Sequence, residues 1–291
     1  MMNNQRWGIA CAVAAYGIWG LFPLYWKFLE TVPALEILSH RVIWSGVLLL
    51  LMLLAIGVRQ RSIALLLNPR QCLVLFASAS ILAVNWGLYI YGVNNDRIIE
   101  TSLGYFINPL VNVLLGAVFL KERLLWGQWL AVALAAIGVG YSIISVGKLP
   151  WIALTLAFSF GLYGLLRKLV KVKPLLALTV ETWFLLPIAI AFLLRQESNY
   201  LGQSGLITWL LIGSGIVTSV PLLCYGSAIQ RLRLSTMGFF QYIAPSLQLG
   251  IGIVVYKEPF TLNNAIVFGF IWTALAVYTI VSFKDRKKVR A

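Results

Sequence analysis

The chain consists of long apolar runs separated by short stretches that contain charged or turn-forming residues. Ten runs can be delimited, at 7–26, 35–56, 72–93, 102–120, 125–146, 150–166, 175–194, 206–228, 235–256 and 262–283. A bilayer core about 30 Å thick requires roughly 20 apolar residues for one helical crossing. Each run is about long enough, although the run at 150–166 is the shortest. The pattern predicts an all-α integral membrane protein with ten transmembrane helices.

Basic residues are distributed unevenly between the two sides that ten spans define. With the N-terminus inside, 17 of the 23 basic residues fall on the cytoplasmic side, 5 fall on the outer side, and Arg41 lies within a span. An excess of lysine and arginine in short loops marks the cytoplasmic face. We therefore expect both termini to be cytoplasmic.

Three segments of the first half recur in the second half in the same order. Residues 16–20 match 160–164, residues 91–106 match 225–240, and residues 107–122 match 243–258. The matches keep a proline and a Lys-Glu pair at the same spacing, which shared apolar composition alone does not explain. The offset changes from 134 to 136 residues, so the ninth span gains Gln241 and Tyr242.

This repeat divides the chain into a first half at 1–146 and a second half at 147–291, which ends in a basic tail. Each half contains five predicted spans, an odd number, so the second half enters the membrane from the opposite side. Inverted repeats of this kind underlie alternating access in many transporters.

Composition supports the membrane interpretation and excludes other classes. The chain is 60% hydrophobic and 11% charged, with a mean hydropathy of +0.88, whereas soluble domains contain about 45–50% apolar and about 25% charged residues. The formal charge of +14 does not indicate nucleic-acid binding, because the basic residues form short clusters between apolar runs. One histidine, three dispersed cysteines and no nucleotide or nucleophile motif predict no metal, no cofactor and no enzymatic activity.

The sequence also resembles a known family. The segments that carry this resemblance are EILSHRVIWS at 36–45, SLGYFINPLVN at 102–112, and LRLST at 232–236 running into GFFQYI at 238–243. The chain resembles the EamA-repeat branch of the drug/metabolite transporter superfamily and, within it, the RarD-type permeases, whose members have been called chloramphenicol-sensitive proteins. The resemblance implies a bacterial inner-membrane carrier of a small molecule, as a monomer or homodimer. It also implies a central cavity formed by the first four helices of each half and a peripheral fifth helix.

Polar and aromatic side chains within the spans are the candidates for substrate binding, because such groups usually face a cavity or a partner. They are His40, Arg41, Trp44, Asn85, Tyr89, Asn108, Asn112, Tyr163, Glu181, Gln241, Tyr242 and Gln248. The amides could instead join helices, and the aromatic residues could pack in the core or anchor at an interface. Pro109 and Pro245 could mark a binding site or a packing kink.

The charged candidates leave several roles open. Arg41 could extend to the outer headgroups, hold an anionic or carboxylate-bearing solute, or form an ion pair that opens during the transport cycle. His40 could couple protons. Glu181 could couple protons, pair with Arg41, or accept structural hydrogen bonds.

The sequence thus predicts a secondary active transporter for a small organic metabolite or drug-like solute, with protons or another ion as a possible coupling partner. The alternatives are a non-transporting membrane accessory or a lipid-translocating component, and an intramembrane enzyme. The non-transporting alternative predicts an apolar centre without a polar cavity between the halves.

Overall fold

The computed structural model describes residues 2–57, 68–121, 124–169, 172–196, 200–232 and 240–288. Every regular element within these residues is helical, which confirms the predicted all-α class. The helices of the first half are α1 (Met2–Gly20), α2 (Phe22–Lys27), α3 (Ala34–Ile56), α5 (Pro69–Asn94), α6 (Ile98–Leu120) and α7 (Trp126–Val146). Those of the second half are α8 (Trp151–Leu169), α9 (Pro174–Arg195), α10 (Gly205–Arg231), α12 (Ile243–Gly250), the π-helical η1 (Ile251–Val255) and α13 (Leu262–Lys288).

Eight helical segments are long and apolar enough to cross a membrane, and they coincide with eight of the ten predicted runs. Shorter apolar helices at Trp151–Arg167 and Ile243–Val255 occupy the places of the sixth and ninth runs. In the ninth run, residues 241–242 form a turn directly before α12, and residues 233–239 lie outside the described part of the chain. The two residues that the second half gains in the repeat are therefore the two residues of this turn.

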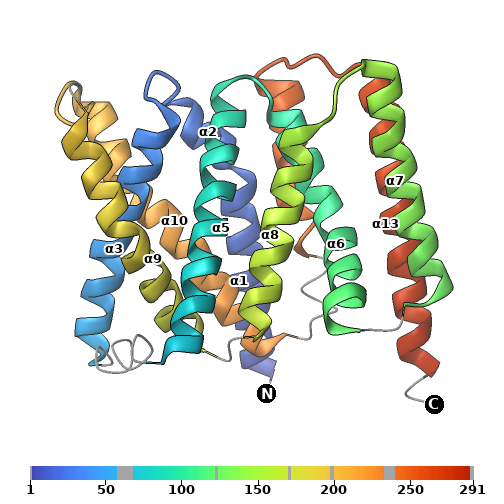
Figure 1. Cartoon of the computed structure of the whole chain (residues 1–291), viewed down its shortest axis with the longest axis horizontal. Coiled ribbons are helices and arrows are strands. Elements are labelled where there is room, and N and C mark those ends of the chain that lie inside the picture. The colour runs from blue at the N-terminus through green and yellow to red at the C-terminus, as the bar shows by residue number, and fades with distance from the viewer. Residues whose placement is uncertain are drawn as a thin grey trace.

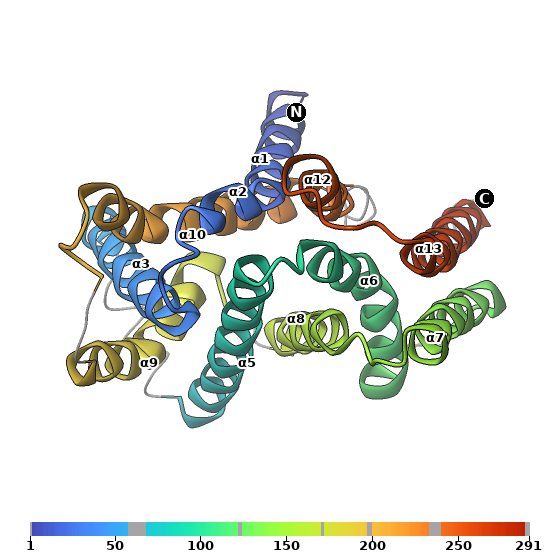
Figure 2. The ribbon, with the colours of Figure 1, turned by 90° about the horizontal axis from the view of Figure 1, so that it is seen from above.

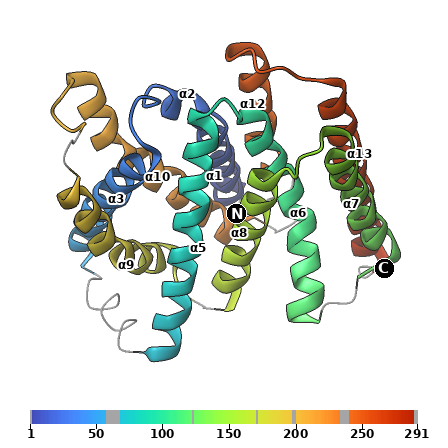
Figure 3. The same ribbon diagram turned by 45° about the horizontal axis from the view of Figure 1, so that its top comes forward.

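The two halves interleave around a common centre. The first helix of each half packs against the third and fourth helices of the other half: α1 contacts α10 and α12, while α8 contacts α5 and α6. Both chain ends lie at one end of the bundle, and α1 runs away from that end while α8 runs toward it (Figure 1). Helices α5 and α8 lie side by side near the middle (Figure 3). The centre of the molecule is therefore built by both halves.

The last helix of each half lies away from this centre. Helices α7 and α13 pack against each other at one edge of the molecule (Figure 2). A hydrogen bond from the Tyr141 hydroxyl to Oδ1 of Asn263 joins them, at 3.0 Å. This arrangement agrees with the peripheral fifth helix that the family resemblance implies.

The duplicated Lys-Glu pairs share a backbone feature. Lys121 and Lys257 have φ angles of 54° and 57°, in the left-handed region that residues with a Cβ seldom adopt. The carboxylate of Glu258 accepts hydrogen bonds from the N–H groups of Ile98 (2.7 Å) and Ile99 (2.9 Å), so it caps the start of α6. Burial raises the pKa of Glu258, although these two N–H groups lower it. Glu122, the equivalent of Glu258, lies outside the described residues.

Candidate functional site

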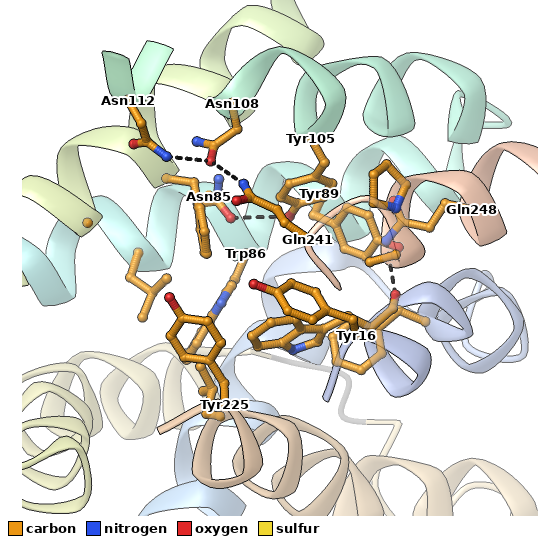
Figure 4. A pocket seen from close by; sticks show the side chains of 18 of the residues that line it. Tyr16, Asn85, Trp86, Tyr89, Tyr105, Asn108, Asn112, Tyr225, Gln241 and Gln248 are labelled. Carbon is orange, nitrogen blue, oxygen red and sulfur yellow. Dashed lines mark hydrogen bonds between the residues drawn. The ribbon is translucent and has the colours of Figure 1, made fainter. Parts of the chain in front are cut away.

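A cavity of about 160 Å³ lies at the centre of the bundle, between helices of both halves. Its walls are mainly aromatic and amide side chains, with one arginine. The lining residues are Tyr16, Trp19, Phe22, Arg41, Leu82, Asn85, Trp86, Tyr89, Tyr105, Asn108, Asn112, Phe160, Gly164, Leu222, Tyr225, Gln241, Ala244, Pro245 and Gln248. The amides of Asn108, Asn112 and Gln241 lie on one side, opposite Tyr16 and Tyr225 (Figure 4).

A hydrogen-bonded group of amides crosses from one half to the other. Oδ1 of Asn108 accepts from Nδ2 of Asn112 (3.0 Å), four residues later on α6, and from Nε2 of Gln241 (3.1 Å) in the turn before α12. Nδ2 of Asn108 donates to the Ala157 carbonyl of α8, at 3.0 Å. The amides therefore both line the cavity and join helices, so the two roles that the sequence left open occur together.

Asn85 fixes the contact between α5 and α8 in the same way. Its Nδ2 donates to the Leu156 carbonyl (3.1 Å) and to the Ser159 hydroxyl (2.9 Å). Its Oδ1 accepts from the Tyr105 hydroxyl, at 3.4 Å. Asn85 is buried and fully bonded, so it acts as a rigid part of the wall.

Gln248 donates a hydrogen bond to a backbone carbonyl group that lacks its usual helical donor because of a proline. Pro23 lies in the first turn of α2 and has no N–H to donate to the carbonyl of Trp19, four residues before it. Nε2 of Gln248 donates to this carbonyl instead, at 2.9 Å. The break between α1 and α2 is thus tied to α12 of the other half, and Oε1 of Gln248 is buried with no partner among the described residues.

Arg41 lies on α3 and is only 2% exposed. Its Nε donates to the Thr218 hydroxyl of α10, at 2.6 Å. Its guanidinium carbon lies 4.2 Å from the ring centre of Trp86, 5.2 Å from Trp26 and 5.7 Å from Phe22. In this arrangement the guanidinium faces the cavity and does not extend to the membrane surface.

Glu181 and Tyr163 form a separate cluster that does not line the cavity. Oε1 of Glu181 on α9 accepts from the Ser78 hydroxyl (2.6 Å) and lies 3.4 Å from Nη1 of Arg167. Oε2 of Glu181 lies 3.5 Å from the Tyr163 hydroxyl. Glu181 therefore pairs with Arg167 of α8, and not with Arg41, because α3 and α9 enter the bundle from opposite ends.

The other candidates that do not line the cavity are His40, Trp44 and Tyr242. His40 is buried next to Glu36, with 3.9 Å between Nε2 and Oε1. The backbone of Trp44 closely faces Gly215, where an added Cβ would collide with it, so Trp44 belongs to the contact between α3 and α10. Tyr242 packs against the apolar cluster around α6, α7 and α13.

Several lining residues were not among the predicted candidates. They are Tyr16, Trp19, Phe22, Leu82, Trp86, Tyr105, Phe160, Gly164, Leu222, Tyr225 and Ala244. Pro245, one of the two prolines that the sequence offered as a mark of a binding site, also lines the cavity, and Pro109 does not. The repeat contained a usable signal, because Tyr16 and Phe160 occupy equivalent positions, each directly before a glycine, and both line the cavity. In the described residues, no group of three His, Cys, Asp or Glu side chains is arranged to hold a metal ion.

The family model and the similar proteins all indicate one family of membrane transporters. Residues 6–144 and 149–280 each match the EamA-like transporter family. An uncharacterized transporter of Vibrio cholerae is 47% identical, with 97% of this chain and 95% of that protein covered. Protein RarD of Escherichia coli K12 is 46% identical, with 98% of each chain covered. A chloramphenicol-sensitive protein RarD of Pseudomonas aeruginosa is 30% identical over 94% of each chain.

A solved crystal structure shares the fold. It superposes with a TM-score of 0.61 at 18% sequence identity, and the match covers 98% of this chain and 99% of the other. At this identity the likeness concerns the fold alone.

Proposed function

This chain belongs to the EamA-like transporter family, and from that premise we propose that it is a secondary carrier of a small organic solute that works by alternating access. The observation that carries the proposal is the central cavity, to which both halves contribute side chains. A site on the axis between two inverted halves can be exposed to either side by rocking one half against the other.

The arrangement of the chain supports the orientation on which this mechanism depends. The proposed halves are 1–146 and 147–291, and their equivalent first helices run in opposite directions (Figure 1). The excess of basic residues on one side supports an orientation with both termini in the cytoplasm. Because bacterial relatives match this chain over 95% and 98% of their own length, the proposed location is the bacterial inner membrane.

The size and walls of the cavity limit the solute. A cavity of about 150 Å³ accommodates benzene in another protein, and the volume here is about 160 Å³. Aromatic walls favour an apolar body, and the amides of Asn112 and Gln241 offer hydrogen bonds at one side (Figure 4). The expected solute is therefore small, with an apolar ring or chain and at least one polar group.

The polar lining also bears on the alternative function. A non-transporting accessory or lipid-translocating component predicts a closed, apolar centre. The cavity holds an arginine and five amide side chains, Asn85, Asn108, Asn112, Gln241 and Gln248. Burying so many polar groups in a membrane protein is unfavourable unless they form hydrogen bonds with each other or with a ligand. A polar cavity of this kind supports the proposed carrier function.

Purified protein in proteoliposomes provides the test. A thermal-shift screen against a panel of small metabolites first identifies binders, since ligands that bind the folded state stabilise it by mass action. Flux of the strongest binder is then measured with and without an ion gradient. Asn112→Ala should reduce flux because Asn112 lines the cavity, whereas Asn263→Ala should leave it unchanged because Asn263 joins only α13 to α7. Equal flux in protein-free and protein-containing vesicles for every binder would reject the carrier.

A further inference from the structure

We propose that the Arg41 end of the cavity is an anion site, and that the solute carries a carboxylate or a similar singly charged anionic group. This inference rests on the proposed function, because it names the class of solute that the cavity accepts. It is carried by three features of Arg41: an uncompensated charge, unused hydrogen-bond donors, and contact with the aromatic rings that would otherwise attract cations.

The charge of Arg41 has no counter-ion within the described part of the chain. No carboxylate there lies within ion-pair distance of it. Two buried carboxylates on α3 and α9 have other contacts: Oε1 of Glu36 accepts from the N–H of Tyr200 (2.8 Å), and Oε1 of Glu181 accepts from the Ser78 hydroxyl (2.6 Å). A guanidinium keeps its proton in proteins, and Arg41 is the only charged residue among those that line the cavity, so the lining carries a net positive charge.

The donors of Arg41 are only partly used. Nε is bonded to Thr218, which fixes the plane of the guanidinium. Nη1 is buried and has no hydrogen-bond partner in the described residues. Leaving a buried donor unsatisfied is unfavourable, and a guanidinium presents its donors in a fork that matches a carboxylate. An anion entering the cavity would complete these bonds and neutralise the charge.

The aromatic rings around Arg41 favour anions over cations. An aromatic wall can attract a ligand cation to the faces of its rings. Here the guanidinium itself lies over Trp86 (4.2 Å) and near Phe22 (5.7 Å). A second cation would compete for these faces and be repelled by Arg41, so cationic aromatic solutes are excluded even though the walls are aromatic.

The rest of the cavity fits the apolar body of such an anion. Tyr16, Trp19 and Tyr225 form a connected aromatic wall, with ring centres 5.3 Å apart for Tyr16–Trp19 and 5.6 Å apart for Trp19–Tyr225. These side chains belong to α1 and α10, one helix from each half. Benzoate is therefore a suitable probe, because it combines one ring of the expected size with one carboxylate.

The experiment compares three probes that share a benzene ring: benzoate, benzamide and benzylamine, which are anionic, neutral and cationic at neutral pH. Binding to the purified wild-type protein in detergent is followed by calorimetry and by thermal shift. We expect benzoate to bind at least about tenfold more tightly than benzamide, as a charge-assisted hydrogen bond implies, and benzylamine to show no binding. This comparison requires no variant and therefore does not depend on whether a variant folds.

Variants then assign the preference to Arg41. Arg41→Gln should abolish the advantage of benzoate over benzamide, and Arg41→Lys should restore part of it. Arg97→Gln is the matched control, because Arg97 pairs with Glu100 (2.6 Å) away from the cavity and should not affect binding. Benzamide or benzylamine binding as tightly as benzoate, or benzoate failing to bind in the millimolar range, would overturn the anion site.

The anion site and the carrier can fail separately. Benzoate binding that depends on Arg41, without any flux in proteoliposomes, would keep the anion site and reject the carrier. Flux of a neutral or cationic solute that is unchanged in Arg41→Gln would keep the carrier and reject the anion site.

Discussion

Arg41 and Glu181 occupy the same position in the two halves, since each is the eighth residue of the second long helix of its half, α3 or α9. Each is bonded to a hydroxyl on the third helix of the opposite half, Arg41 to Thr218 on α10 and Glu181 to Ser78 on α5, both at 2.6 Å. The two sites therefore share one geometry and carry opposite charges.

The surroundings of the two side chains differ. Glu181 has a cation, Arg167, and a second hydroxyl, Tyr163, both from α8. Arg41 has aromatic rings and the cavity beside it, and no carboxylate of the described residues lies within ion-pair distance. The comparison indicates that a buried charge paired with another side chain, such as Glu181, stabilises the fold. A buried charge that faces a cavity without such a partner, such as Arg41, is available to bind a ligand. The predictions below test this difference.

The largest effect is expected on transport by Arg41→Gln. Uptake of radiolabelled benzoate into proteoliposomes should fall by about tenfold to a hundredfold, because a hydrogen bond to a charged group contributes about 1.5–3 kcal/mol. Arg97→Gln, which removes an arginine outside the cavity, should retain wild-type uptake. Equal uptake by the Arg41 variant and the wild type would remove Arg41 from the site.

Removing the arginine at each of the two sites, Arg41 or Arg167, should affect stability in opposite ways. Arg167→Gln removes the cation beside buried Glu181 and should destabilise the protein by about 1–3 kcal/mol, with part of the loss recovered in the double variant Arg167→Gln/Glu181→Gln. Arg41→Gln removes a charge that has no counter-ion among the described residues and should leave the unfolding midpoint unchanged or raise it. Unfolding in one detergent at one protein concentration measures all four proteins. A large loss of stability in Arg41→Gln would contradict the comparison.

The sequence predicted much of this architecture because lipid restricts it strongly. Apolar runs in a membrane form helices, so eight of the ten predicted spans coincide with long helices and the other two with shorter ones. The two residues that the second half gains, Gln241 and Tyr242, form the turn directly before α12. This turn was not predicted, because the apolar run at 235–256 has the pattern of one continuous span.

The site was partly predictable for a related reason. Arg41, Asn85, Asn108 and Gln248 were identified because polar side chains within a span must face protein or a cavity. Aromatic side chains have no such requirement, so Tyr105 and Tyr225 were not separable in sequence from rings that face lipid. The prediction that Glu181 lines the cavity could not be corrected from the sequence. Its partners lie on α5 and α8, and only the fold brings these helices next to α9.

A smaller effect is expected on the rate of efflux when benzoate is present on the opposite side of the membrane. When the empty cavity closes, the charge of Arg41 has neither water nor an anion beside it, and this state is unfavourable. The loaded carrier should therefore cross faster than the empty one. Unlabelled benzoate outside the vesicles should accelerate efflux of labelled benzoate several-fold, and Arg41→Gln should abolish this acceleration. Efflux that does not depend on external benzoate would show that the empty carrier returns freely.

The smallest effect concerns the two amides that donate to Asn108. Gln241 reaches Asn108 from the second half, at 3.1 Å, whereas Asn112 reaches it from one turn away on the same helix, at 3.0 Å. Gln241→Ala removes a bond between halves and should destabilise the protein by about 1 kcal/mol. Asn112→Ala removes a bond within α6 and should cost about 0.2–0.5 kcal/mol, as pairs four residues apart on a helix do. Unfolding midpoints measured in the same detergent distinguish the two, and equal losses would show that the turn at 241–242 does not hold the halves together.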